Sequence, residues 1–169
     1  MIIYEVSGGT DYMVIGRSGA FPHYGARQFR PTAAGLVDSI TVKIKATTAR
    51  DNYAVRMVLR ADDAGEPDDA VMELSTTILS SITLAGVNYT FDFAGTTALA
   101  LLTDYWMVIY RTENQYSSVN VYADEAVAND ARNDFDGLQP WNPTDDVMDL
   151  KIEGGLAGPG GRSWGVIIV

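Results

Sequence analysis

Apolar and polar residues alternate with a period of two along most of the chain, which is typical of β-strands with one buried face. The clearest case is residues 36–46, where apolar side chains occupy one face and serine, threonine and lysine the other. The same alternation recurs in residues 53–61 and 89–93. Residues 105–111 are apolar on both faces, which predicts a central strand buried from two sides and places Trp106 in the core.

Further strands are expected at residues 2–6, 12–15, 119–123 and 147–152, with glycines between the strands marking turns. A short helix is expected at residues 124–134, whereas residues 68–80, whose apolar spacing is mixed, are expected to be strand or irregular. About eight short strands at regular spacing predict an all-β protein, an antiparallel β-sandwich of jelly-roll type with little helix.

The length of 169 residues suits a single domain with a substantial core. We expect one jelly-roll sandwich over residues 1–153, with its core in 20–153. Residues 154–169 are expected to be a glycine-rich tether followed by a β-branched C-terminal strand. This strand has two interpretations: it folds back as an edge strand of its own sandwich, or it adds to the sheet edge of a neighbouring subunit.

The charge balance narrows the choice of partners. The chain has 22 acidic and 12 basic residues, a net charge of -10, which argues against binding nucleic acid or an anionic membrane surface. Cysteine is absent, which excludes disulfides, thiolate zinc sites and cysteine nucleophiles. The N-terminus lacks the pattern of a signal peptide, and the longest apolar run is too short to span a membrane, so we expect a soluble protein.

Several short motifs follow one another in an order that resembles a known family. They are ARQFRPTAAGLVDSI at 26–40, VLRADDAGEP at 58–67, a strand around LST at 74–76, YTFDF at 89–93, LTDYWMVI at 102–109, and Trp141 followed by DLKIEG at 149–154. This order resembles the jelly-roll domain called a choice-of-anchor domain, found in phage structural proteins and secreted bacterial surface proteins. The resemblance covers roughly residues 20–154. It implies a β-sandwich with a binding or structural role, and it supplies no catalytic residues.

Two acidic clusters are candidate calcium sites, because carboxylate oxygens on a turn suit a hard cation. The first contains Asp62 and Asp63, and the second contains Asp134 and Asp136. The alternative is that both are solvated turns between strands. We therefore expect no cofactor, with calcium as the alternative.

No set of residues indicates catalysis. The single histidine, His23, has no serine in a nucleophile elbow to act with, and no spacing singles out a pair of carboxylates for glycoside hydrolysis. We expect the protein not to be an enzyme, and we assign no catalytic residue.

Trp141, which is expected to lie in a loop, and two tyrosines near it in sequence offer a glycan-binding alternative. Trp141, with Tyr116 and Tyr122, combines flat apolar rings with neighbouring polar groups, as many sugar-binding faces do. The competing interpretation is that Trp141 caps one end of the sandwich.

The leading hypothesis is a virion structural protein, a phage capsid decoration (cement) or tail subunit. It would contact itself and other virion proteins, such as the major capsid protein. The expected assembly contacts lie at the two ends of the chain: Ile2, Ile3, Trp164, Val166, Ile167, Ile168 and Val169. The alternative is an extracellular protein, a carbohydrate-binding module of a secreted protein or phage fibre, either with or without a dependence on calcium.

Overall fold

The computed structural model describes residues 1–6, 11–16, 24–47, 51–112, 118–125, 131–134, 140–143 and 146–155. These residues form strands and connecting turns, and no helix occurs among them. Accordingly, no helix of the described ranges is long and apolar enough to cross a membrane.

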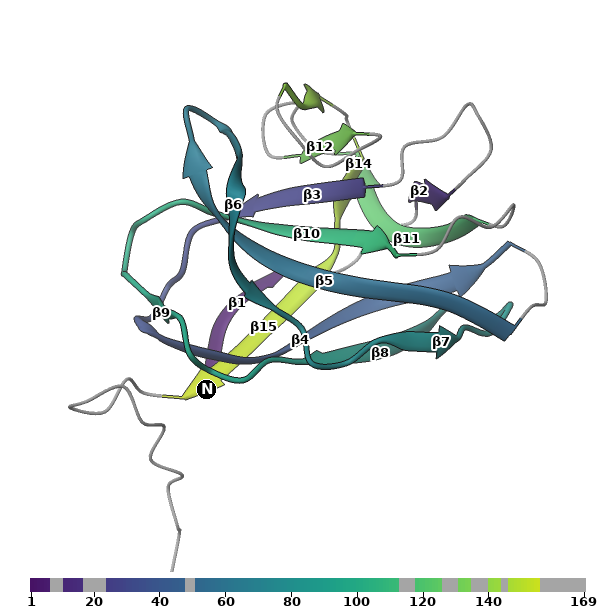
Figure 1. The fold of residues 1–169 in the computed structure, drawn as a ribbon, viewed down its shortest axis with the longest axis horizontal. Coiled ribbons are helices and arrows are strands. Elements are labelled where there is room, and N and C mark those ends of the chain that lie inside the picture. Colours follow the sequence, from purple (N-terminus) through teal and green to yellow (C-terminus); the bar gives the residue numbers. More distant parts are fainter. Residues whose placement is uncertain are drawn as a thin grey trace, which may run out of the picture.

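The strands form two antiparallel sheets that pack face to face (Figure 1). The eight-stranded sheet contains β1 (Ile2–Val6), β2 (Asp11–Gly16), β4 (Gly35–Ala46), β8 (Val87–Asp92), β9 (Ala98–Leu99), β11 (Ser118–Glu125), β14 (Asp146–Met148) and β15 (Leu150–Gly155). The seven-stranded sheet contains β3 (Tyr24–Phe29), β5 (Asp51–Asp63), β6 (Glu66–Leu74), β7 (Leu79–Ser81), β10 (Tyr105–Arg111), β12 (Ala131–Asp134) and β13 (Asn142–Pro143). The predicted all-β sandwich is therefore confirmed, and its assignment to the jelly-roll type stays a prediction.

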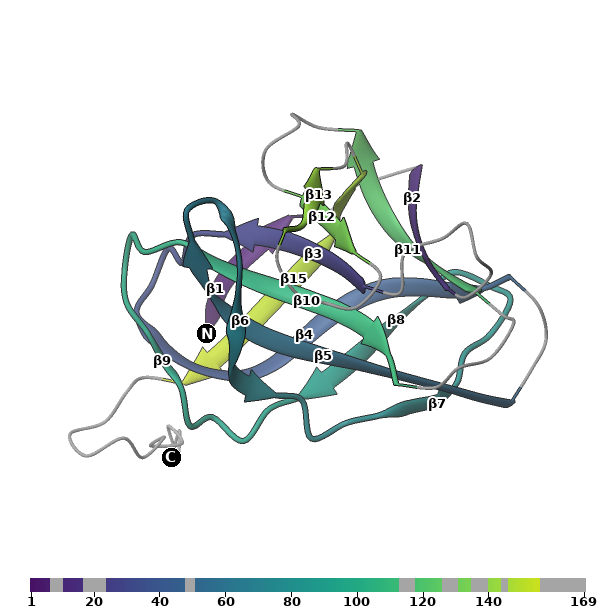
Figure 2. The ribbon, with the colours of Figure 1, turned by 45° about the horizontal axis from the view of Figure 1, so that its top comes forward.

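β10 lies between β3 and β5 in the seven-stranded sheet (Figure 2). Val108 pairs with Ala26 on one side and with Val58 on the other. All five residues from Tyr105 to Ile109 are buried, so both faces of the strand are covered. This confirms the central strand that the unbroken apolar run predicts.

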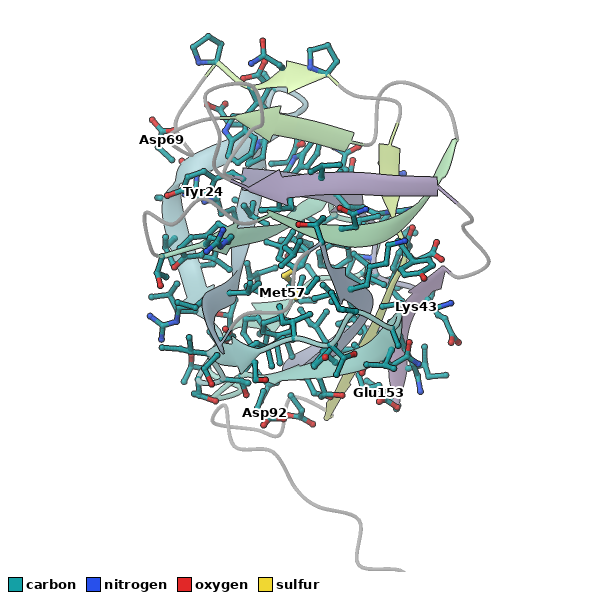
Figure 3. All side chains as sticks on the ribbon, turned by 90° about the vertical axis from the view of Figure 1, so that its right-hand side faces the viewer. Tyr24, Lys43, Met57, Asp69, Asp92 and Glu153 are labelled. Carbon is teal, nitrogen blue, oxygen red and sulfur yellow. The ribbon has the colours of Figure 1, made fainter. Side chains whose placement is uncertain are left out.

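The main core fills the space between the sheets, because the inward-facing positions of both are apolar. Met57 and Met107 from one sheet meet Ile40, Ile44 and Phe91 from the other, and all five are fully buried. In Figure 3, Met57 lies between the two layers of strands, whereas Lys43, Asp92 and Glu153 lie at the outside. The alternation read from the sequence therefore separates core from surface in these strands.

Both ends of the described chain are part of the sandwich. Ile3, Met13 and Ile15 are buried in the main core, which therefore begins before residue 20, where it was expected to begin. The expected glycine-rich tether begins at Gly154, which the structure places inside β15. A Cβ on Gly154 would lie 1.9 Å from the carbonyl oxygen of Leu36, so this glycine is closely packed. Residues 156–169 lie outside the described residues.

The segment with helical spacing is extended wherever it is described. β11 runs to Glu125 and β12 begins at Ala131, so the short helix expected at 124–134 is wrong for these parts. Residues 126–130 lie outside the described ranges. Sheet pairing of β11 with β14 and of β12 with β3 accounts for the extended backbone.

Candidate functional site

A second apolar cluster lies on the outer face of the seven-stranded sheet, opposite the main core. It consists of Ala26, Val58, Trp106, Val108 and Trp141, all buried. The first four stand on β3, β5 and β10, at positions that alternate with core residues. Trp141 comes from the segment before β13 and covers them.

Tyrosines border this cluster. The rings of Tyr24 and Tyr110 are stacked, with centroids 5.1 Å apart and an interplanar angle of 10°. Tyr24 also meets the Trp141 ring edge to face, with centroids 6.3 Å apart. These contacts hold Trp141 against the sheet.

Trp141 is therefore not an exposed sugar platform. It is only 3% exposed, and the Arg60 guanidinium lies 5.7 Å from its ring centroid. Burial lowers the pKa of Arg60, and its Nη1 donates a hydrogen bond to the Asp68 carbonyl at 3.1 Å. A ring face covered in this way cannot stack on a sugar in this conformation; the glycan-binding role expected of Trp141 stays a prediction. The alternative, a capping role, is closer, although Trp141 covers the face of a sheet rather than an end of the sandwich.

The other two candidate aromatic residues do not join Trp141. Tyr122 stands on β11 of the opposite sheet, where the Lys43 ammonium lies 4.1 Å from its ring centroid. Tyr116 lies outside the described residues. Trp141 and Tyr122 therefore pack on different sheets and do not form one binding face.

The first candidate calcium ligand, Asp62, serves as a hydrogen-bond acceptor within the fold. Its Oδ1 accepts from Trp106 Nε1 and from Gln28 Nε2, both at 2.7 Å, and its Oδ2 accepts from the Gly65 backbone at 3.2 Å. Ala64 and Gly65 both have positive φ, which is the geometry of a tight type I′ hairpin turn. The solvated-turn interpretation fits this arrangement.

The remaining candidate ligands do not complete a site. Asp63 is exposed on the hairpin beside Asp62. The backbone of Asp134 belongs to β12, while its side chain and the whole of Asp136 lie outside what the structure describes. In the described ranges no three acidic or histidine side chains are grouped so that they could hold a metal ion.

Two assembly contacts were expected at the N-terminus; Ile3 is buried and Ile2 is exposed. Ile3 is fully buried in the main core and its carbonyl accepts from the Thr32 backbone at 2.9 Å, so its side chain packs within its own subunit; the assembly role expected of Ile3 stays a prediction. Ile2 is 48% exposed. The C-terminal candidates Trp164, Val166, Ile167, Ile168 and Val169 lie outside the described residues.

The turn between β9 and β10 exposes two adjacent leucines, a feature that the sequence analysis missed. Leu101 is 51% exposed and Leu102 is 70% exposed, and Leu102 has a φ of 60°. We call Leu101 and Leu102 the leucine turn. The available signal was the position of two apolar residues in a turn, where polar residues are usual.

A pocket of about 340 Å³ lies beside this turn, lined by Tyr4, Gln28, Phe29, Arg30 and Asp104. Arg30 and Asp104 form a two-pronged ion pair at 2.7 and 2.6 Å. The pocket was also missed, because its residues come from three separate parts of the sequence.

Comparisons of the sequence with protein-family models and with curated proteins find no match. The resemblance to choice-of-anchor domains therefore stays a prediction.

Proposed function

We propose that the chain is a non-enzymatic subunit of a larger protein assembly, such as the decoration layer or the tail of a phage particle. It would act through contacts with copies of itself and with other virion proteins. The leucine turn is the observation that supports this proposal most directly.

Leu102 is held in an unfavourable backbone conformation. A residue other than glycine in the left-handed region costs roughly 1 kcal/mol, and asparagine or glycine is the usual occupant. At 70% exposure the Leu102 side chain gains little burial within its own subunit. Local strain that persists without an internal benefit is typical of functional positions, and an exposed apolar pair favours contact with another protein.

The leucine turn is continuous with other apolar groups at the same end of the sandwich. Met1 is about half exposed, and its methyl group would lie 2.9 Å from a Cβ on Gly35. Gly35 pairs with Leu99, two residues before Leu101. Gly155, at the end of β15, pairs with the neighbouring Leu36. These placements support one assembly surface made of the leucine turn and the N-terminus; the C-terminal strand expected from the sequence would add to it.

Light scattering over a range of protein concentrations tests the proposal. We expect the full chain to form a closed oligomer, and we expect the double variant Leu101→Ser/Leu102→Asn and a chain ending at Gly160 to be smaller. Asparagine tolerates the backbone of residue 102, so the double variant should remain folded. The control is Leu84→Ser, which changes a leucine that is 57% exposed in another loop and should leave the mass unchanged.

The proposal fails if the full chain is monomeric at every concentration. It also fails if the oligomer is unaffected by both the double variant and the truncation.

A further inference from the structure

The pocket beside the leucine turn has the chemistry of a binding site, and it is independent of the proposed assembly function. It lies where β3 ends and β10 begins, toward the left of Figure 1. Tyr4 comes from the eight-stranded sheet, whereas Gln28 and Phe29 come from the seven-stranded sheet. A volume of about 340 Å³ is at the small end of the range for ligand sites.

The polar side of the pocket is the ion pair of Arg30 and Asp104. Arg30 Nε donates to Asp104 Oδ1 at 2.7 Å, and Arg30 Nη2 donates to Oδ2 at 2.6 Å. The hydrogen bond raises the pKa of Arg30 and lowers the pKa of Asp104, so both groups stay charged at neutral pH. This ion pair uses Nε and Nη2 of Arg30, and Nη1 donates no hydrogen bond to any of the described residues. Adjacent ligand hydroxyls could then donate to the carboxylate and accept from Nη1.

The aromatic side of the pocket is rigid. The rings of Tyr4 and Phe29 pack with centroids 5.6 Å apart, and the Tyr4 hydroxyl accepts a hydrogen bond from Arg27 Nη2 at 3.0 Å. The Arg27 guanidinium also lies 5.8 Å from the Tyr4 ring centroid, but Tyr4, unlike Trp141, is only partly buried and lines the pocket. The Gln28 side chain is held on the outer face of the sheet, where its Nε2 donates to Asp62 at 2.7 Å, so the fixed polar groups beside the rings are Arg30 and Asp104. An apolar ring next to fixed polar groups is the combination that recognises a molecule with both C–H faces and hydroxyls.

The charge of the pocket selects among such molecules. Arg30 and Asp104 cancel each other, and the whole chain carries a net charge of -10, which disfavours anions. The geometry points to a binding site for one uncharged saccharide unit, held by the Arg30–Asp104 pair against Tyr4. A ligand as small as one sugar ring, bound in an open pocket, is expected to have a dissociation constant on the order of 1 mM.

Saturation-transfer NMR tests this site with the full chain and methyl glycosides of neutral hexoses, deoxyhexoses and N-acetylhexosamines. Asp104→Asn keeps the shape of the side chain and removes its charge, and Arg30→Met removes the guanidinium. We expect each variant to weaken binding at least tenfold. The matched control is Glu153→Gln, which breaks the exposed ion pair of Lys151 and Glu153 on the opposite sheet and should leave binding unchanged.

Three results would overturn the inference. They are no binding of any neutral glycoside to the full chain at tens of millimolar, binding that survives both pocket variants, and stronger binding of glucuronic acid than of the neutral sugars. The Leu101→Ser/Leu102→Asn variant separates this inference from the assembly proposal, because neither leucine lines the pocket.

Discussion

Asp62 and Trp106 form a hydrogen bond of 2.7 Å across the outer face of the seven-stranded sheet, from the indole Nε1 to the carboxylate Oδ1. Trp106 is fully buried, so this carboxylate gives its N–H a partner that water cannot supply. The same oxygen accepts from Gln28, which stands beside Trp106 on β3. Asp62 therefore ties β3, β5 and β10 together at their outer face.

Replacing Asp62 with alanine should destabilise the protein by about 2–3 kcal/mol, because it removes the carboxylate that accepts from the buried indole N–H. Urea unfolding followed by circular dichroism measures this change. Asp63→Ala is the control, since Asp63 is exposed and its loss should cost under about 0.5 kcal/mol. Equal effects of the two variants would show that the hydrogen bond to Trp106 contributes little.

Trp141 gives a second prediction about the same face. Trp141→Ala should cost about 3–5 kcal/mol, because it uncovers Val58 and Val108 and removes the contact with Tyr24. Trp141→Phe should cost clearly less, since the buried Nε1 has no hydrogen-bond partner among the described residues and its loss is not penalised.

Chemical denaturation of the two Trp141 variants beside the wild type provides the measurement. An alanine variant as stable as the wild type would mean that Trp141 does not cover the sheet in solution.

Local pattern was sufficient to predict β10 and the faces of β4, because each side chain's environment follows from its position along the strand. The burial of Trp141 could not be predicted in this way. The sequence around it predicts a loop, because its neighbours are Pro140, Asn142 and Pro143. The ring that packs against Trp141 belongs to Tyr24, which is 117 positions away in sequence. The same limit applies to Arg30 and Asp104, whose pairing depends on how β3 and the leucine turn meet.

The conformation of Leu102 escaped prediction for a different reason. Leucine disfavours positive φ, so propensity argues against the conformation that Leu102 adopts. Asp62 accepts three hydrogen bonds within the fold, and the sequence could not show this, because a carboxylate in an acidic turn has the same sequence pattern as a calcium ligand.

Gly154 should tolerate no side chain. A Cβ there would lie 1.9 Å from the Leu36 carbonyl oxygen and 2.4 Å from Ile3 Cδ1, so Gly154→Ala must shift backbone in β4 or β15. We expect a loss of about 3 kcal/mol in the free energy of unfolding.

Gly65→Asn is the matched control for Gly154→Ala in the same unfolding experiment. Nothing lies within 4 Å of a Cβ on Gly65, and asparagine tolerates its φ of 87°, so this variant should change stability by under about 1 kcal/mol. The prediction is contradicted if Gly154→Ala is as mild as Gly65→Asn.

The Arg30–Asp104 pair predicts a pH dependence of stability. The hydrogen bond from Arg30 lowers the folded pKa of Asp104, so the folded state binds fewer protons here than the unfolded state, whose aspartate pKa is about 3.9. The stabilisation is therefore fully present above about pH 5 and is lost as the pH falls through the lowered folded pKa. The difference in unfolding free energy between the wild type and Asp104→Asn should be constant near neutral pH and shrink below about pH 4. Urea unfolding of both proteins from pH 7 to pH 2.5 measures it, with Glu153→Gln as the control at the other exposed pair. A difference that does not change with pH would mean that Asp104 is not paired with Arg30 in solution.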